Sequence, residues 1–115
     1  MLKADIVRLQ HMVDAANQAT SFVARKSRTE LDNDQPVALA LVKLIEIFGE
    51  AASRLGRDVK SQYPEIPWAD IIAMRNRLIH GYFDVNLDIV WRTVTEEMPP
   101  IVKQIESLLA SADPE

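Results

Sequence analysis

The sequence contains no cysteine, which excludes disulfide bonds and thiolate chemistry. Its two histidines, His11 and His80, are too few for a histidine-rich metal site unless two chains share one. No apolar run reaches the roughly 18–20 residues that a membrane-spanning helix requires. Charges at Lys3, Asp5 and Arg8 interrupt the apolar core that a secretory signal peptide would need. We therefore expect a soluble, cytoplasmic protein.

Basic side chains are concentrated in one part of a chain whose net charge is -4. Residues 54–80 contain five basic and three acidic side chains, a net of +2, so the remainder carries -6. The five basic residues are Arg54, Arg57, Lys60, Arg75 and Arg77. A local basic island can bind a phosphodiester at one place, but it would not coat nucleic acid non-specifically. The alternative is that these charges are scattered and carry no function.

The first part of the chain predicts one long amphipathic helix and a loop. Over residues 2–24, apolar residues recur at alternating steps of four and three, which is the helical period. The predicted stripe comprises Leu2, Ile6, Leu9, Val13, Ala16, Thr20 and Val23. His11 belongs to the polar side, where we expect a solvated surface residue. A polar loop follows over residues 25–35, and Asp34 is expected to cap the next helix ahead of Pro36.

Residues 36–57 predict a second helix that is apolar on more than one side. Its main stripe comprises Val37, Ala40, Leu41, Leu44, Phe48, Ala51 and Leu55, and further apolar residues are Ala38, Leu39, Val42, Ile45 and Ile47. A helix of this kind needs cover on several faces. Either it is a central helix buried within one subunit, or a second copy of the chain covers part of it.

A stiff connector separates the second helix from the third. Pro64 and Pro67 stand three positions apart and prevent regular helix between them. The third helix is expected to begin at Pro67 or Trp68, to carry Asp70 in its first turn, and to end at Gly81. Its predicted inner side comprises Trp68, Ile71, Ile72, Arg75, Leu78 and Ile79.

The last part of the chain predicts a fourth helix that is kinked or split. Asn86 can cap it, and Pro99-Pro100 then break or kink it, because proline lacks a backbone donor and clashes one turn back. The apolar residues on this helix are Leu87, Val90, Trp91, Val94, Ile101, Ile105, Leu108 and Leu109. No repeat or linker divides the sequence. We therefore predict one domain over residues 1–115, an all-α up-and-down bundle of four main helices, the last kinked or split at Pro99-Pro100.

The densest group of reactive side chains lies between Met74 and Tyr82. Arginine offers a permanently charged fork of donors that fits a phosphate, and histidine can take or give a proton near neutral pH. Together these groups suffice for metal-free cleavage of RNA, in which the ribose 2′-OH attacks the adjacent phosphorus and arginine stabilises the developing charge. The products would carry a 2′,3′-cyclic phosphate and a 5′-OH, and DNA would be spared.

The spacing of these residues restricts how they can meet. On an ideal helix Arg75 and His80 do not share a face, whereas Asn76 and His80 do. Either the helix loosens near Gly81, or the site is completed across the two-fold axis of a dimer. Each residue also has a plain structural interpretation: a histidine that caps carbonyls, an arginine paired with a carboxylate, and a tyrosine, Tyr82, that packs with its hydroxyl in water.

The segment Arg75-Asn-Arg-Leu-Ile-His80-Gly-Tyr82 resembles the Arg-x4-His-x-Tyr signature of the HepT-like branch of the HEPN superfamily. The flanking sequence is similar as well, over roughly residues 30–105. The similar stretches are Ile47-Phe-Gly-Glu-Ala-Ala, Tyr63-Pro-Glu-Ile-Pro-Trp, Ile71-Ile-Ala-Met-Arg-Asn and Ile89-Val-Trp, followed by Pro99-Pro100. The Arg-His motif is weakly specific by itself, but its combination with the Tyr-Pro-x-Ile-Pro-Trp lead-in is highly specific.

The resemblance implies an α-helical homodimer with the motif in a cleft between subunits. It implies a metal-independent endoribonuclease without a cofactor, acting as the toxin of a type VII-like toxin–antitoxin pair. The antitoxin would be a nucleotidyltransferase of the MNT type (MntA), which silences the toxin by AMPylation of the motif tyrosine. By this resemblance Arg75 and His80 are catalytic, Asn76 is a polar helper and Tyr82 is the modification site.

Two further expectations concern substrate and alternatives. Candidate contacts to RNA phosphates are Arg77, Arg54, Arg57 and Lys60. The alternative function is a non-catalytic helical subunit of a nucleotidyltransferase, in which the Arg-His pair holds a nucleotide or substrate phosphate without cleaving it.

Overall fold

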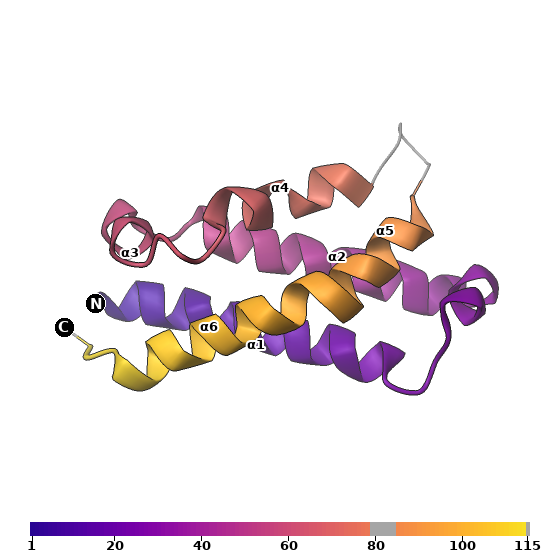
Figure 1. Ribbon diagram of the computed structural model, residues 1–115, viewed down its shortest axis with the longest axis horizontal. Coiled ribbons are helices and arrows are strands. Elements are labelled where there is room, and N and C mark those ends of the chain that lie inside the picture. The colour runs from indigo at the N-terminus through magenta and orange to yellow at the C-terminus, as the bar shows by residue number, and fades with distance from the viewer. Residues whose placement is uncertain (79–84, 115) are drawn as a thin grey trace.

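A computed structural model describes residues 1–78 and 85–114 as an all-α bundle, which confirms the predicted fold class (Figure 1). The longer helices are α1 (Lys3–Val23), α2 (Gln35–Ser53), α4 (Trp68–Leu78) and α6 (Met98–Ser111). The shorter elements are the 3-10 helix η1 (Arg28–Asn33), α3 (Arg57–Gln62), α5 (Leu87–Arg92) and the π-helical turn η2 (Thr93–Glu97). None of the described helices combines the length and apolar character that crossing a lipid bilayer requires.

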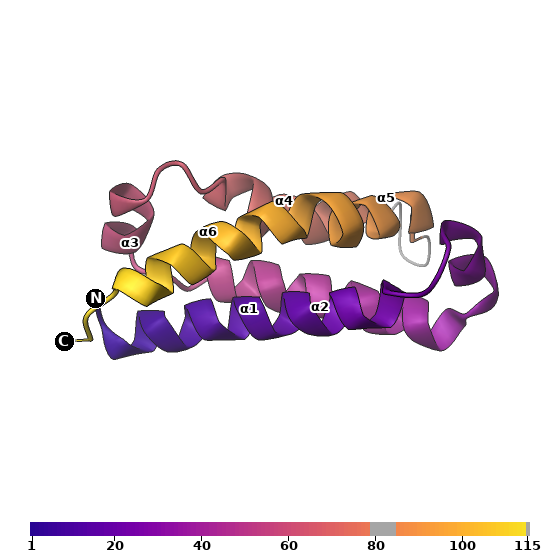
Figure 2. The same ribbon diagram turned by 60° about the horizontal axis from the view of Figure 1, so that its bottom comes forward.

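Helix α1 lies alongside both α2 and α6, as both views show (Figures 1 and 2). Its buried residues are Asp5, Leu9, Met12, Ala15, Ala16, Ala19 and Val23. The predicted stripe is therefore partly wrong: Leu2 is 58% exposed and Thr20 is also exposed, while Met12 and Ala19 are fully buried. The buried face of α1 is rotated by about one residue from the predicted stripe, because several small alanines and a buried carboxylate lie on the side that packs against the other helices.

That buried carboxylate, Asp5, ties the start of α1 to the turn after α2. Its side chain accepts a hydrogen bond from the backbone N–H of Gly56, with N and Oδ1 3.2 Å apart. Arg8 approaches the same oxygen at 3.6 Å. A Cβ on Gly56 would lie 3.4 Å from Asp5 Oδ2, so the absence of a side chain at Gly56 leaves room for the carboxylate. The hydrogen bond and ion pair make the burial of this charge tolerable.

Helix α2 lies at the centre of the bundle and buries Leu41, Ile45 and Phe48 completely. Much of the cover that its broad apolar surface needs is supplied by α1 and α4 of the same chain. Leu39 and Ile47 stay 57% and 38% exposed, so part of this surface is left uncovered by the described residues.

Both predicted helix caps are confirmed. The Oδ1 of Asp34 accepts from the backbone N–H of Val37 at 3.2 Å, at the start of α2. The Oδ1 of Asn86 accepts from the backbone N–H of Ile89 at 3.1 Å, at the start of α5. Each side chain satisfies a donor that the first turn of a helix leaves without a partner.

The second helix ends earlier than predicted, at Ser53 rather than at residue 57. A turn through Gly56 leads into α3, which the sequence pattern missed because it is only six residues long and buries the single side chain Val59. Helix α4 begins at Trp68, as predicted, and its indole N–H donates to the carbonyl of Tyr63 at 3.0 Å across the proline-containing connector.

The inner side of α4 differs from the prediction at one position. Trp68, Ile71 and Leu78 are buried as expected, but the fourth buried residue is Met74 rather than Arg75. Arg75 has a side chain that is 51% exposed. A thioether packs in a core without loss, whereas a buried guanidinium would need a full set of partners. Ile79 and the predicted stop at Gly81 lie outside the described residues.

The last helix is interrupted close to the predicted place. Pro99 and Pro100 stand in the first turn of α6, and the interruption is the π-helical turn of Thr93–Glu97 just before them. Proline clashes with the carbonyl four residues earlier, and a wider turn relieves that clash. The hydroxyl of Thr93, which is fully buried, donates to the carbonyl of Ile89 at 2.8 Å and stabilises this turn.

Candidate active site

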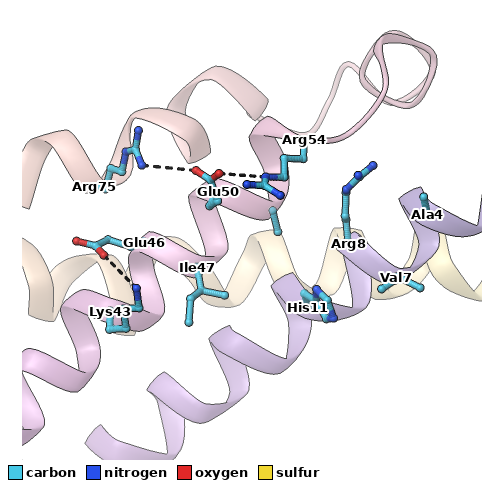
Figure 3. Close-up of a pocket in the computed structure, with 11 residues that line it drawn as sticks. Ala4, Val7, Arg8, His11, Lys43, Glu46, Ile47, Glu50, Arg54 and Arg75 are labelled. Carbon is cyan, nitrogen blue, oxygen red and sulfur yellow. Dashed lines mark hydrogen bonds and ion pairs between the residues drawn. The ribbon is translucent and has the colours of Figure 1, made fainter.

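Arg75 lies in the last described turn of α4 and faces Glu50 on α2. Its Nη1 is 3.6 Å from Glu50 Oε2. The other carboxylate oxygen, Oε1, accepts a hydrogen bond from Arg54 Nε at 3.1 Å. One carboxylate is thus placed between two guanidinium groups from two helices (Figure 3). All three side chains are substantially exposed, so the arrangement is open to a charged ligand.

The close approach of α2 and α4 at this point depends on Gly49. A Cβ added there would lie 3.1 Å from the backbone carbonyl oxygen of Ile71 and 3.6 Å from that of Ile72. A separation of 3.1 Å between a Cβ and a carbonyl oxygen is shorter than an ordinary van der Waals contact. Glycine therefore allows the backbone of α4 to rest against α2, one residue before Glu50.

A groove of about 670 Å³ extends from Arg75 along α2 and α1 (Figure 3). It is lined by Ala4, Val7, Arg8 and His11 of α1, by Lys43, Glu46, Ile47, Glu50 and Ala51 of α2, by Arg54 directly after α2, and by Arg75 of α4. Four lining residues are permanently cationic and two are carboxylates, which gives a net of +2 with His11 neutral. Val7 and Ile47 add exposed aliphatic surface, 46% and 38% accessible.

Asn76 and Arg77 do not join this groove. Asn76 is exposed, and Arg77 Nη1 lies 3.3 Å from Glu97 Oε1 of η2. Two positions along a helix turn the side chain by about 200°, so Arg75 and Arg77 leave α4 in different directions. Arg75 approaches α2, whereas Arg77 approaches the π-helical turn.

His80 and Tyr82, the other two predicted site residues, lie outside the described residues. The described residues on either side of them are linked, since the N–H of Asn86 donates to the carbonyl of Leu78 at 2.7 Å. This hydrogen bond places the start of α5 next to the end of α4. Arg75 is therefore one turn of helix away from the point where the motif continues beyond Leu78.

The basic island predicted from the sequence is divided in space. Arg54 and Arg75 share the groove, and Arg77 is turned toward η2. Arg57 and Lys60 lie on α3, which Figure 1 shows at one end of the bundle, beyond the start of α4 and away from its last turn. The structure therefore brings only two of the five basic residues together.

The groove also contains residues that the sequence reasoning did not select. Glu50 had a local signal, because it stands four positions before Arg54 at the C-terminal end of α2, and opposite charges meet at this spacing. Arg8 and His11 had none, since they lie more than 60 residues before Arg75 and reach it only through the packing of α1 on α2. His11 is exposed, as predicted, but it faces the groove that contains Arg75.

Comparison with known proteins places this sequence in a family. The sequence profile described as "Ribonuclease HepT-like" matches residues 12–108. The protein named "Putative RNase MJ1380" of Methanocaldococcus jannaschii is 31% identical over 107 residues, which cover 92% of this chain and 98% of that protein. "Putative RNase MJ1216" of the same organism is 34% identical over 101 residues, which cover 88% and 80%. "Probable ribonuclease HepT" of Thermococcus cleftensis is 39% identical over 75 residues, which cover 65% and 68%.

No solved structure shows a significant match to this chain. The matched segment nevertheless runs from the middle of α1 to the last turn of α6, and it includes Glu50, Arg54 and the whole motif from Arg75 to Tyr82. The chain therefore belongs to the HepT-like ribonuclease family and is an enzyme of the endoribonuclease class, as the sequence resemblance predicted.

Proposed function

We propose that this chain, one domain over residues 1–115, is a metal-independent endoribonuclease toxin whose catalytic residues are Arg75 and His80. The observation that carries the proposal is the exposed guanidinium of Arg75 at the edge of a cationic groove, one helical turn before the position where the motif continues. Family membership supports the same activity class. The complete Arg-x4-His-x-Tyr pattern of the sequence supports an active rather than a degenerate copy.

The reaction uses only groups that the chain and the RNA supply. The imidazole of His80 takes the proton of the ribose 2′-OH, whose oxygen then attacks the neighbouring phosphorus. The guanidinium of Arg75 stabilises the charge that develops on the phosphoryl oxygens, and Asn76 donates a further hydrogen bond. The 5′-oxygen of the next nucleotide then leaves and receives the proton that His80 removed, which yields a 2′,3′-cyclic phosphate and a 5′-OH.

The site is proposed to work in a homodimer. Arg75 and His80 stand five positions apart, and on a regular helix they would diverge by about 140°. A two-fold axis beside α4 would let the arginine of one subunit meet the histidine of its partner. Leu39 of α2, which is 57% exposed and lies outside the groove, offers aliphatic surface that a second copy can bury.

Tyr82 is proposed as the site of silencing by a cognate nucleotidyltransferase of the MNT type. The tyrosine oxygen would lose its proton to solvent and attack the α-phosphorus of ATP. A phosphodiester to AMP would form, the bond from the α-phosphorus to the bridging oxygen would break, and pyrophosphate would leave with that oxygen. The product places a bulky anion two residues from His80, where it would occupy the cleft and repel an RNA phosphate. Such a pair would act in the cytoplasm, where RNA and ATP are both present.

The direct test is cleavage of single-stranded RNA by the purified protein in the presence of EDTA. We expect fragments with a 2′,3′-cyclic phosphate, no cleavage of DNA, and at least a hundredfold loss of kcat in Arg75→Ala, a typical effect of removing a transition-state donor. His80→Ala should be similarly inactive, with an unchanged helical circular dichroism spectrum. Full activity in both variants would reject the site.

A second candidate is a nucleotide-binding subunit without catalysis, in which Arg75 only holds a phosphate. The net charge of +2 in the groove lining favours it, because this charge attracts a phosphate whether or not a bond is cut. Calorimetry separates the two functions. Tight binding of a nucleotide, together with no RNA cleavage at high protein concentration, would support the binding subunit.

A further inference from the structure

The groove between α1 and α2 contains cations that the proposed reaction does not use. Arg8 and His11 come from α1, and Lys43 comes from α2, about two turns before Glu50 (Figure 3). None of these residues belongs to the Arg-x4-His-x-Tyr motif or to the basic segment of residues 54–80. They share one continuous groove with Arg75 all the same.

The charge of this groove contrasts with that of the whole chain. Its lining carries a net of +2, against -4 for the complete sequence. Glu50 is shared between Arg54 and Arg75, and Glu46 is 3.9 Å from Lys43, the edge of ion-pair distance. The Lys43 side chain is 71% exposed, so its ammonium group is accessible to a ligand phosphate. An anion in the groove would thus meet an excess of positive charge.

The shape and the apolar surface of the groove also fit a nucleotide. Its volume of about 670 Å³ is larger than one phosphate requires. Val7 of α1 and Ile47 of α2 both expose aliphatic surface in the groove lining, and ribose and base faces are apolar enough to lie on it. Sites for small organic ligands commonly combine such an apolar surface with a few charged groups.

We propose that this groove, which we call the α1–α2 groove, binds the RNA strand beside the scissile phosphate. The substrate class is single-stranded RNA longer than a dinucleotide. The scissile phosphodiester lies at Arg75, and Arg8, His11 and Lys43 contact a phosphate or ribose farther along the same strand. The inference rests on the proposed function, and it names the substrate-binding surface of that site on a helix, α1, that carries none of the motif.

Binding of a 2′-O-methyl RNA oligonucleotide of mixed sequence tests the groove, because this probe lacks the nucleophile and stays intact on the wild-type protein. The test variant is Lys43→Glu, and its matched control is Lys103→Glu, an equal charge change at an exposed position of α6 outside the groove. We expect Lys43→Glu to weaken binding about tenfold more than Lys103→Glu, with a salt slope smaller by about 0.7, the value of one lost contact to a single strand.

A second variant, His11→Asn, tests the α1 side of the groove without changing a lysine. Its kcat/KM should fall several-fold more on an RNA oligonucleotide than on a dinucleotide, which has only the scissile phosphate. Equal effects of Lys43→Glu and Lys103→Glu on binding and on the salt slope would overturn the proposal. The proposal would also be overturned if Lys43→Glu shifted the protein from dimer to monomer in solution and left its RNA affinity unchanged. The groove would then be a contact between two copies of the chain.

The outcomes separate the groove from the catalytic site. If Arg75→Ala abolishes cleavage while the two lysine variants bind RNA equally, the groove is rejected and the proposed function stands. If Lys43→Glu weakens RNA binding more than Lys103→Glu but the wild-type protein never cleaves RNA, the groove stands and the proposed function is rejected.

Discussion

Glu50 of α2 holds Arg75 of α4 through an ion pair of 3.6 Å, at the point where Gly49 brings the two helices together. A carboxylate in this position has two opposite effects on the proposed chemistry. It restricts where the guanidinium of Arg75 can point, and it also occupies the donors that an RNA phosphate would use. The balance of these effects can be measured by removing the charge and keeping the shape.

The variant Glu50→Gln should lower both KM and kcat for RNA. Loss of one carboxylate raises the net charge of the groove, so we expect KM to fall about threefold at low salt. The turnover rate should fall as well, because Arg75 loses the partner that orients it. Steady-state cleavage kinetics measure both constants. The control is Glu46→Gln, which removes the same charge from the groove at a residue that pairs with Lys43. This variant should change KM alone. An equal kcat for the two variants would contradict a positioning role for Glu50.

Gly49→Val should destabilise the fold and reduce cleavage together. Branched side-chain atoms at this position have to displace the backbone carbonyl of Ile71, which a Cβ would approach at 3.1 Å. Overpacking of this kind costs about 1–3 kcal/mol. Urea denaturation followed by circular dichroism measures the change. Ser53→Val, at an exposed position of the same helix, controls for helix propensity and should lose less than about 0.7 kcal/mol.

Asp5→Leu should destabilise the protein more than Asp5→Asn. Leucine leaves the backbone N–H of Gly56 without its acceptor, and an unsatisfied donor of this kind costs about 1–3 kcal/mol. Asparagine keeps an acceptor oxygen and loses only the 3.6 Å ion pair with Arg8, which is partly exposed and contributes about 0–1 kcal/mol. Thermal or urea unfolding of the two variants gives the difference, and equal stabilities would show that the Gly56 hydrogen bond contributes little.

Tyr82→Phe should escape silencing and remain a ribonuclease. Phenylalanine keeps the ring but lacks the oxygen that would be joined to AMP. Incubation with the cognate nucleotidyltransferase and ATP, followed by mass spectrometry, should add AMP to the wild-type chain and none to the variant. Tyr63→Phe is the matched control, because it removes the only other tyrosine hydroxyl and should leave modification unchanged. A Tyr82→Phe protein that is modified and silenced like the wild type would refute the role of this residue.

Local sequence signals were reliable where the structure depends on neighbouring residues. Asp34 and Asn86 were predicted as caps because each bonds a backbone N–H three positions ahead, which needs no other part of the fold. The start of α4 at Trp68 follows for a similar reason, since the prolines before it prevent an earlier beginning. The short helix α3 was missed, because six residues with one buried side chain have too little periodicity to detect.

Predictions that depend on contacts between helices were less accurate. The inward face of α1 is turned by one residue because Asp5 is held by Gly56, a residue 51 positions away. Arg75 was expected on the inner side of α4, and Met74 takes that place. In both cases the hydrophobic period was correct and only the tertiary partner decided which of two adjacent positions is buried.

The sequence by itself determined the helical class, the caps, and the Arg-x4-His-x-Tyr motif with the flanking sequence that resembles the family, since these are properties of short segments. Only the tertiary structure decided that Arg8 and His11 of α1 share a groove with Arg54 and Arg75, and that Arg57, Lys60 and Arg77 do not. The physical reason is that charged residues close together in the sequence need not be close together in space, and a ligand contacts residues that share a surface. That surface is formed by helices whose packing depends on side chains far apart in the chain, such as Gly49 against Ile71.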